Sequence, residues 1–116
     1  MQLISNKTEA RYRAELILSR DELFKKNGAP RLLKILRTNY PDLDSAFVLH
    51  WIPEQGEDIY EILINEHEIL AVEISRIDTG ECVTKIISLD EFLSRTRSKQ
   101  KMIKLAVALD LIRGEK

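Results

Sequence analysis

The side chains of this chain that are best suited to chemistry are two histidines and one cysteine. Histidine can bind metals and transfer protons near neutral pH, but a metal site needs several ligands that converge on one point. His50 is expected at a solvent-facing position of a strand and His67 in a turn, and their separation matches no recognised ligand pattern. We therefore predict no metal site and no cofactor.

Cys82 is the single cysteine, so the chain cannot form an intramolecular disulfide and fits a reducing compartment. A nucleophilic cysteine needs a base within reach and a neighbour that favours the thiolate. The adjacent residues, Glu81 and Val83, supply neither. The four glycines also lack the spacing of a phosphate-binding loop. The sequence therefore predicts a protein without catalytic residues.

Charge is segregated along the chain. Residues 1–40 carry nine Lys/Arg and four Asp/Glu, a balance of +5, and residues 92–116 carry seven and two, again +5. Residues 41–91 carry two Lys/Arg and thirteen Asp/Glu, a balance of −11, which the overall net charge of −1 conceals. Segregation of this kind influences the choice of partners and the rate of association more than the fold.

The acidic middle segment gives the leading hypothesis about function. An acidic sheet surface speeds encounter with a basic protein, and exposed aromatic side chains can anchor the complex. We expect a non-catalytic protein-binding domain, for example a bacterial immunity protein that inhibits a nuclease toxin. The residues expected to contact the basic partner are two aromatic residues and seven acids: Trp51, Tyr60, Glu54, Glu57, Asp58, Glu61, Glu66, Glu68 and Glu73. The alternative, in which Trp51 and Tyr60 belong to the core and the acids are only solvated, stays open at this stage.

The basic ends support a second hypothesis, a regulatory nucleic-acid-binding protein. Rows of cations on helices can neutralise phosphates. The residues of the two rows are Arg31, Lys34, Arg37, Lys99, Lys101 and Lys104. No aromatic residue is interleaved with the cations of residues 95–104 for stacking on bases, and no helix-turn-helix spacing is evident. The protein-binding hypothesis is therefore the stronger one.

The elements that would position these residues form a single α+β domain over residues 1–116. Apolar and polar residues alternate in four segments, which predicts a four-stranded antiparallel meander over about residues 46–87. The predicted strands cover residues 46–52, 59–64, 69–77 and 82–87. A polar connection over residues 53–58 separates the first two strands.

Helices are expected on both sides of the meander in sequence. Residues 8–18 fit a strand and a helix, with a slight preference for helix. A capping box at Ser19–Glu22 predicts that a new, short helix starts there, and a further helix follows over residues 30–40. A second capping box at Ser88–Glu91 precedes a C-terminal helical segment, which ends in a helix over residues 99–113 and packs on one face of the sheet.

Apolar runs in the chain are short. None approaches the length of about 20 residues that spans a membrane, and the first residues lack the apolar run of a signal peptide. We therefore expect a cytoplasmic protein with no membrane partner. The broad apolar face from Met102 to Ile112 offers a surface for a homodimer.

Overall fold

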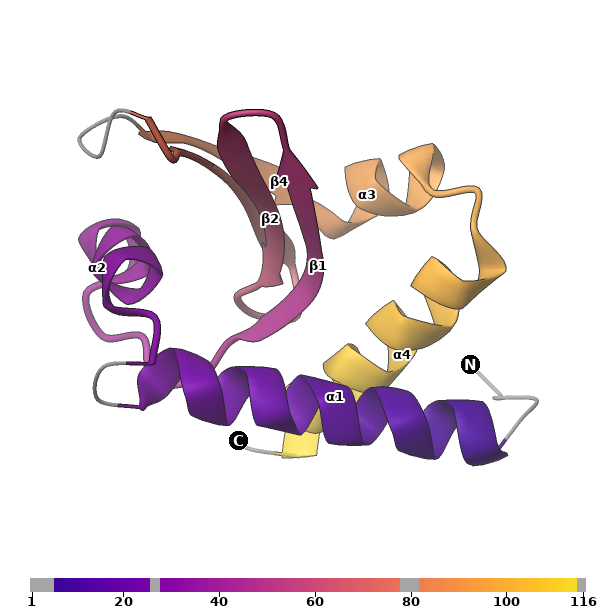
Figure 1. The fold of residues 1–116 in the computed structure, drawn as a ribbon. Helices are drawn as coiled ribbons and strands as arrows, with labels where there is room; N and C mark the ends of the chain where they lie inside the picture. Colours follow the sequence, from indigo (N-terminus) through magenta and orange to yellow (C-terminus); the bar gives the residue numbers. More distant parts are fainter. Residues whose placement is uncertain (1–5, 26–27, 78–81, 115–116) are drawn as a thin grey trace.

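The computed structural model describes residues 6–25, 28–77 and 82–114. The strands form one antiparallel sheet in the order β1-β2-β3-β4 (Figure 1). The strands are β1 Phe47–Glu54, β2 Glu57–Leu63, β3 Glu68–Ser75 and β4 Cys82–Ser88. The helices are α1 Asn6–Phe24, α2 Pro30–Asn39, α3 Leu89–Arg95 and α4 Lys99–Gly114. The predicted α+β class and the antiparallel meander are confirmed.

Helices lie on both faces of the sheet, with α4 on one side and α2 on the other (Figure 1). Successive strand residues point to opposite faces, so the sheet contributes to two separate cores. On the α4 face, residues such as Phe47, Leu63 and Ile69 pack with the apolar side chains of α1 and α4. On the α2 face, Ile62 and Leu70 belong to a second buried cluster with residues of α2. The predicted packing of the C-terminal segment on one face is confirmed.

On the α4 face the helices leave one end of the sheet uncovered, whereas on the α2 face only the β1 side of that end is exposed and Ile74 of β3 stays buried. The cross-strand row of Phe47, Leu63, Ile69 and Ile87 is buried near the β2–β3 turn. Towards the β1–β2 turn the side chains emerge, and Trp51 is 58% exposed. We call residues 51–60 of the β1–β2 hairpin, together with the adjacent Glu73, the open end of the sheet.

The capping box predicted at Ser19–Glu22 is wrong. α1 continues through it to Phe24, and the Ser19 hydroxyl donates a hydrogen bond to the carbonyl of Leu16, 2.8 Å away, within the same helix. Leu16 and Leu23 are both buried, so an unbroken helix places both in the core. Burial of a leucine contributes about 1.5–3 kcal/mol, whereas a cap contributes about 1 kcal/mol, and burial therefore decides the outcome.

The connection predicted over residues 53–58 is too long. β1 and β2 continue pairing as far as Glu54 and Glu57, which leaves Gln55 and Gly56 as a two-residue turn. Gly56 has a φ of 82°, a conformation that glycine adopts without steric cost and that tight hairpins require. Pro53 is accommodated in β1 because this is an edge strand, where a residue without an N–H donor is tolerated.

Candidate functional site

The β1–β2 hairpin gathers predicted binding residues at the open end. Its register pairs Trp51 with Tyr60 and Glu54 with Glu57. Since strand residues alternate between faces, Trp51, Asp58 and Tyr60 lie on the α2 face, and both glutamates lie on the α4 face. The hairpin therefore presents aromatic side chains on one face of its tip and carboxylates on both faces.

The indole of Trp51 is exposed and yet held in place. It stacks on the ring of Tyr60 with centroids 6.5 Å apart, and its Nε1 donates a hydrogen bond to Asp58 Oδ1 at 3.0 Å. Arg76 Nη2 donates to the same oxygen at 2.6 Å. The hydrogen bonds from Arg76 and then Trp51 lower the pKa of Asp58, so this carboxylate is charged at neutral pH. Trp51 is thus fixed in one orientation before any partner arrives.

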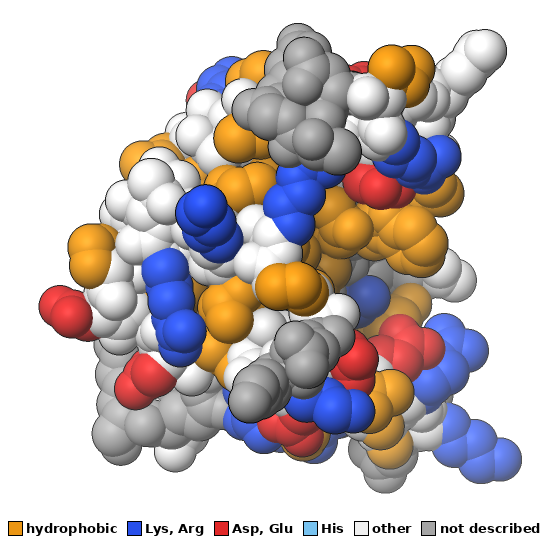
Figure 2. Space-filling view, turned by 60° about the vertical axis from the view of Figure 1, so that its left-hand side comes forward, with side chains coloured by type: hydrophobic (Ala, Val, Ile, Leu, Met, Phe, Trp, Pro, Cys, Tyr) orange, Lys and Arg blue, Asp and Glu red, His pale blue; other side chains and the backbone are white. Residues whose placement is uncertain are grey.

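On the face shown in Figure 2, side chains of both charge signs are mixed. Figure 2 views the molecule from the side on which α2 lies in Figure 1, and hydrophobic side chains reach the surface there with Lys/Arg and Asp/Glu side chains scattered among them. Trp51 illustrates this local mixture, since its neighbour Asp58 is paired with Arg76. A partner that docks there would therefore contact apolar surface and charge together.

On the α4 face, a groove runs between the sheet, the end of α3 and the start of α4. Its volume is about 390 Å³ and its floor includes the apolar side chains of Ile52, Ile59 and Val83. Glu73 is paired with both Ile59 and Val83 across the strands and is exposed. Arg95 and Lys101 also line the groove. The open end therefore continues on this face into a surface with an apolar floor and charges of both signs.

His50 and Glu61 form a pair on the same α4 face of the sheet. His50 Nδ1 lies 2.8 Å from Glu61 Oε1, and the imidazole stacks on Phe92 with centroids 6.2 Å apart. The prediction that His50 faces solvent is wrong, because an irregularity in the pairing between Val48 and His50 inserts Leu49 and turns His50 towards the α4 face. The hydrogen bond with His50 lowers the pKa of Glu61, and the charges of His50, Lys101 and Arg95 add to this effect. Glu61 is therefore already partnered within the chain.

Two further acids of the predicted binding set lie at the other end of the sheet, Glu66 in the β2–β3 turn and Glu68 at the start of β3. Glu66 Oε1 accepts a hydrogen bond from Arg113 Nε at 3.2 Å. Glu68 Oε1 accepts one from Asn65 Nδ2 at 3.1 Å. The structure therefore brings together Trp51, Glu54, Glu57, Asp58, Tyr60 and Glu73, and it separates Glu66 and Glu68 from them.

The two basic rows lie on opposite faces of the sheet, because one belongs to α2 and the other to α4. Within the α2 row, Arg31 Nη1 donates to the Ser75 carbonyl at 2.9 Å, Lys34 is exposed, and Arg37 lies over the ring of Phe24.

The lysines of the α4 row differ in their exposure. Lys99 and Lys101 are exposed, and Lys101 lines the groove. Lys104 is partly buried against α1, with its Nζ 3.9 Å from Glu15 Oε2, and burial lowers its pKa. No single patch includes both rows.

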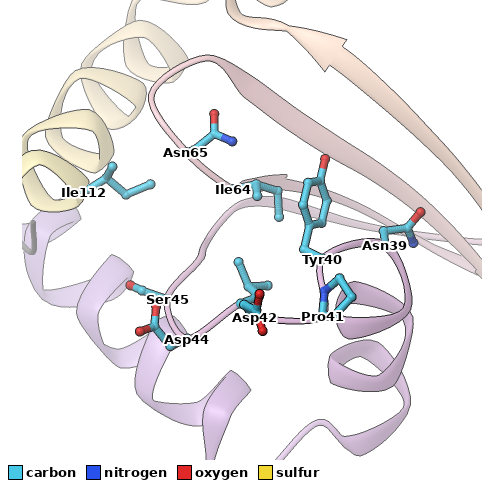
Figure 3. Close-up of a pocket in the computed structure, with 10 residues that line it drawn as sticks. Asn39, Tyr40, Pro41, Asp42, Asp44, Ser45, Ile64, Asn65 and Ile112 are labelled. Carbon is cyan, nitrogen blue, oxygen red and sulfur yellow. The ribbon is translucent and has the colours of Figure 1, made fainter.

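A second cavity, of about 480 Å³, lies where the α2–β1 connection meets the β2–β3 turn (Figure 3). Figure 3 shows Asn39, Tyr40 and Pro41 on one side of it and Ile112 of α4 on the other. Burial raises the pKa of Tyr40 to about 12, and the nearby charge of Glu68 adds to this shift. The cavity includes none of the residues that the sequence selected as binding candidates.

The residues that the structure describes contain no group of three or more His, Cys, Asp or Glu side chains placed to hold a metal ion. Among the described helices, none has the length and apolar character needed to cross a membrane. Comparison of the chain with models of protein families, with curated proteins and with solved structures found no significant match. The functional interpretation therefore depends on the geometry alone.

Proposed function

We propose that this protein is a non-catalytic binding domain that docks a basic protein partner through the open end of its sheet. The observation that carries the proposal is the exposed indole of Trp51, held by Tyr60 and Asp58 on one face of a hairpin that carries Glu54 and Glu57 on its other face. Aromatic side chains that are fixed before binding lose little conformational freedom in a complex and are common interface anchors.

The acids of the open end supply the charge that selects the partner. Within the described part of the chain, Glu54, Glu57 and Glu73 form no ion pair and are exposed or half-buried. Carboxylates in this state attract a basic surface over long distances and can pair with its Lys and Arg side chains. Acidic proteins and nucleic acids would be disfavoured beside these carboxylates.

The sharpest form of this proposal is an inhibitor of a nuclease, such as a bacterial immunity protein. A nuclease binds phosphates through a basic surface, and the open end offers carboxylates and an aromatic anchor on the two faces of one hairpin. Docking there would block the access of nucleic acid without any chemistry on the inhibitor's side.

The experiment that tests the proposal is affinity capture from lysate of the native host, with one half of the lysate treated with nuclease. The bait variants are the wild-type chain, the double reversal Glu54→Lys/Glu57→Lys and a matched control, Asp42→Lys/Asp44→Lys. The control reverses two exposed acids of the α2–β1 connection, away from the open end. We expect a stoichiometric basic protein that survives nuclease treatment, binds the control and is lost with the Glu54/Glu57 variant.

Two results would overturn the proposal. One is retention of the same protein by the Glu54/Glu57 variant at the wild-type level. The other is recovery of nucleic acid alone, which would assign function to the cations of α2 and α4 instead.

A further inference from the structure

β4 is an edge strand whose outer side is open. Among the residues that the structure describes it pairs with β3 only, and all of its residues from Cys82 to Ile86 are exposed. Val83 is 55% exposed and Ile86 is 57% exposed. An unpaired strand edge with apolar side chains is a template for pairing with another strand, and proteins usually protect such edges.

The other edge of the sheet is protected in a way that β4 is not. β1 contains an irregularity next to Val48 and a proline at position 53, and both interrupt regular pairing on its free side. β4 pairs in continuous register with β3 over its whole length. Its only charged side chain is Lys85. The contrast indicates that β4 is the edge that can accept a further strand.

We propose that β4 pairs antiparallel with β4 of a second copy of this chain, which would join the two sheets into one. A twofold axis perpendicular to the sheet keeps the α4 faces of both copies on the same side. Residues that lie opposite each other must then share a face, so the axis passes beside a single residue of β4.

The position of Lys85 limits which residue of β4 can lie on the twofold axis. A register centred on Lys85 would place two ammonium groups opposite each other, which is unfavourable. A register centred on Ile86 would bring Lys85 of the second copy against the buried Ile87 and the start of α3. A register centred on Thr84 keeps the two lysines apart and pairs the five exposed residues of β4 with one another, Val83 with Lys85 and Cys82 with Ile86, between the copies.

The register centred on Thr84 also gives charge complementarity. Within one copy, Glu73 is the cross-strand partner of Val83 and is exposed. Lys85 of the second copy would lie opposite Val83 on the same face, so its aliphatic stem would cover Val83 and its ammonium group would extend towards Glu73. The twofold axis repeats this interaction, so each copy contributes one lysine and one glutamate.

Cysteine cross-linking tests the register directly. In a Cys82→Ser background, Thr84→Cys would place two thiols opposite each other, at a Cα separation of about 4.5–5.5 Å that suits a disulfide. Val83→Cys and Lys85→Cys would place their thiols on diagonal positions, too far apart for direct bonding. Under mild oxidation we expect the Thr84→Cys variant to form covalent dimers at least about tenfold faster than either control.

Sedimentation of the wild-type chain and of two lysine variants tests whether the dimer exists without a cross-link. We expect a species of twice 13.5 kDa, and Val83→Lys should raise its dissociation constant at least about tenfold, because the new lysine would face Lys85 of the second copy. Leu18→Lys is the matched control, since Leu18 is an exposed apolar residue of α1.

A wild-type monomer at all concentrations up to about 0.2 mM would overturn the proposal, and so would equal cross-linking of all three cysteine variants. A Kd in the micromolar range corresponds to about −8 kcal/mol and lies within this window. The dimer would engage Glu73, which the proposed function also uses, but the two results stay separable because the hairpin reversals at Glu54 and Glu57 leave both Glu73 and β4 unchanged.

Discussion

The two ends of the sheet are made by the same strands and yet differ in what surrounds them. On the α4 face near the β2–β3 turn, Phe47 and Leu63 are fully buried. Further along the same face, Ile52 is 39% exposed and Val83 is 55% exposed, although they occupy equivalent positions of the pleat. The difference arises because α1 and α4 reach only one end. Alternation therefore determines which face a residue occupies, whereas the helices determine whether that position is core or surface.

The prediction with the largest expected effect concerns the covered end of the sheet, near the β2–β3 turn. Leu63→Ala should lower the free energy of unfolding by about 2–5 kcal/mol, because it leaves a cavity in the core. Ile52→Ala, on the same face at the open end, should lower the free energy of unfolding by less than about 1 kcal/mol. Urea denaturation followed by circular dichroism measures both. Similar losses for the two variants would contradict the contrast between the ends.

The second prediction concerns binding at the open end. Trp51→Ala should weaken binding of the captured basic protein by at least about 2 kcal/mol, as expected for an aromatic anchor. Its effect on the free energy of unfolding should be smaller, because much of the indole is already exposed to water. Calorimetric titration measures the affinity. An unchanged affinity would remove Trp51 from the interface.

The third prediction concerns the turn at the tip of the open end. Gly56→Ala should lower the free energy of unfolding by about 1–2 kcal/mol, because a φ of 82° is strained for residues with a Cβ. The added Cβ would also lie 3.2 Å from Ile77 Cδ1. Gln55→Ala is the matched control and should have little effect. Equal stability of the two variants would contradict the tight turn.

The smallest expected effect concerns pH. Because Glu61 has a lowered pKa in the folded state, its contribution is complete above the ordinary carboxyl value of 4.5 and is lost as pH falls through the lowered folded-state pKa. Glu61→Gln should therefore lose about 1 kcal/mol or less at pH 7 and should flatten the decline of stability below pH 4.5. Denaturation curves between neutral and acidic pH measure this. A parallel decline in the wild type and the variant would contradict the assignment.

Much of the fold followed from local patterns. Strand alternation predicted the meander, and Ser88 caps α3 as predicted, with its hydroxyl accepting a hydrogen bond from the Glu91 amide. The break predicted at Ser19 failed, because a local capping signal was outweighed by the burial of Leu16 and Leu23 in one helix. Local capping motifs thus predict the ends of helices correctly where burial of nearby apolar side chains does not favour a longer helix.

The site was only partly predictable. Pairing in a hairpin brings Trp51 and Tyr60 together by register, whereas Asp58 joins them because the pairing continues beyond the predicted strand ends. The pair of His50 with Glu61 depends on the irregularity at Leu49, which no turn or proline signal marks. Which end of the sheet the helices leave open depends on tertiary packing, so the sequence did not separate anchors from core residues.

The most direct test of the central claim uses Trp51, the only tryptophan of the chain, as a reporter at the open end. The measurement is the fluorescence of Trp51 during titration with the basic protein recovered by affinity capture. The partner is used as a segment or variant that lacks tryptophan, so that the signal comes from Trp51. Docking at the open end predicts a blue shift of the emission and weaker quenching by acrylamide, because the indole leaves water. Saturable binding with an unchanged spectrum and unchanged quenching would place the partner elsewhere and contradict the account.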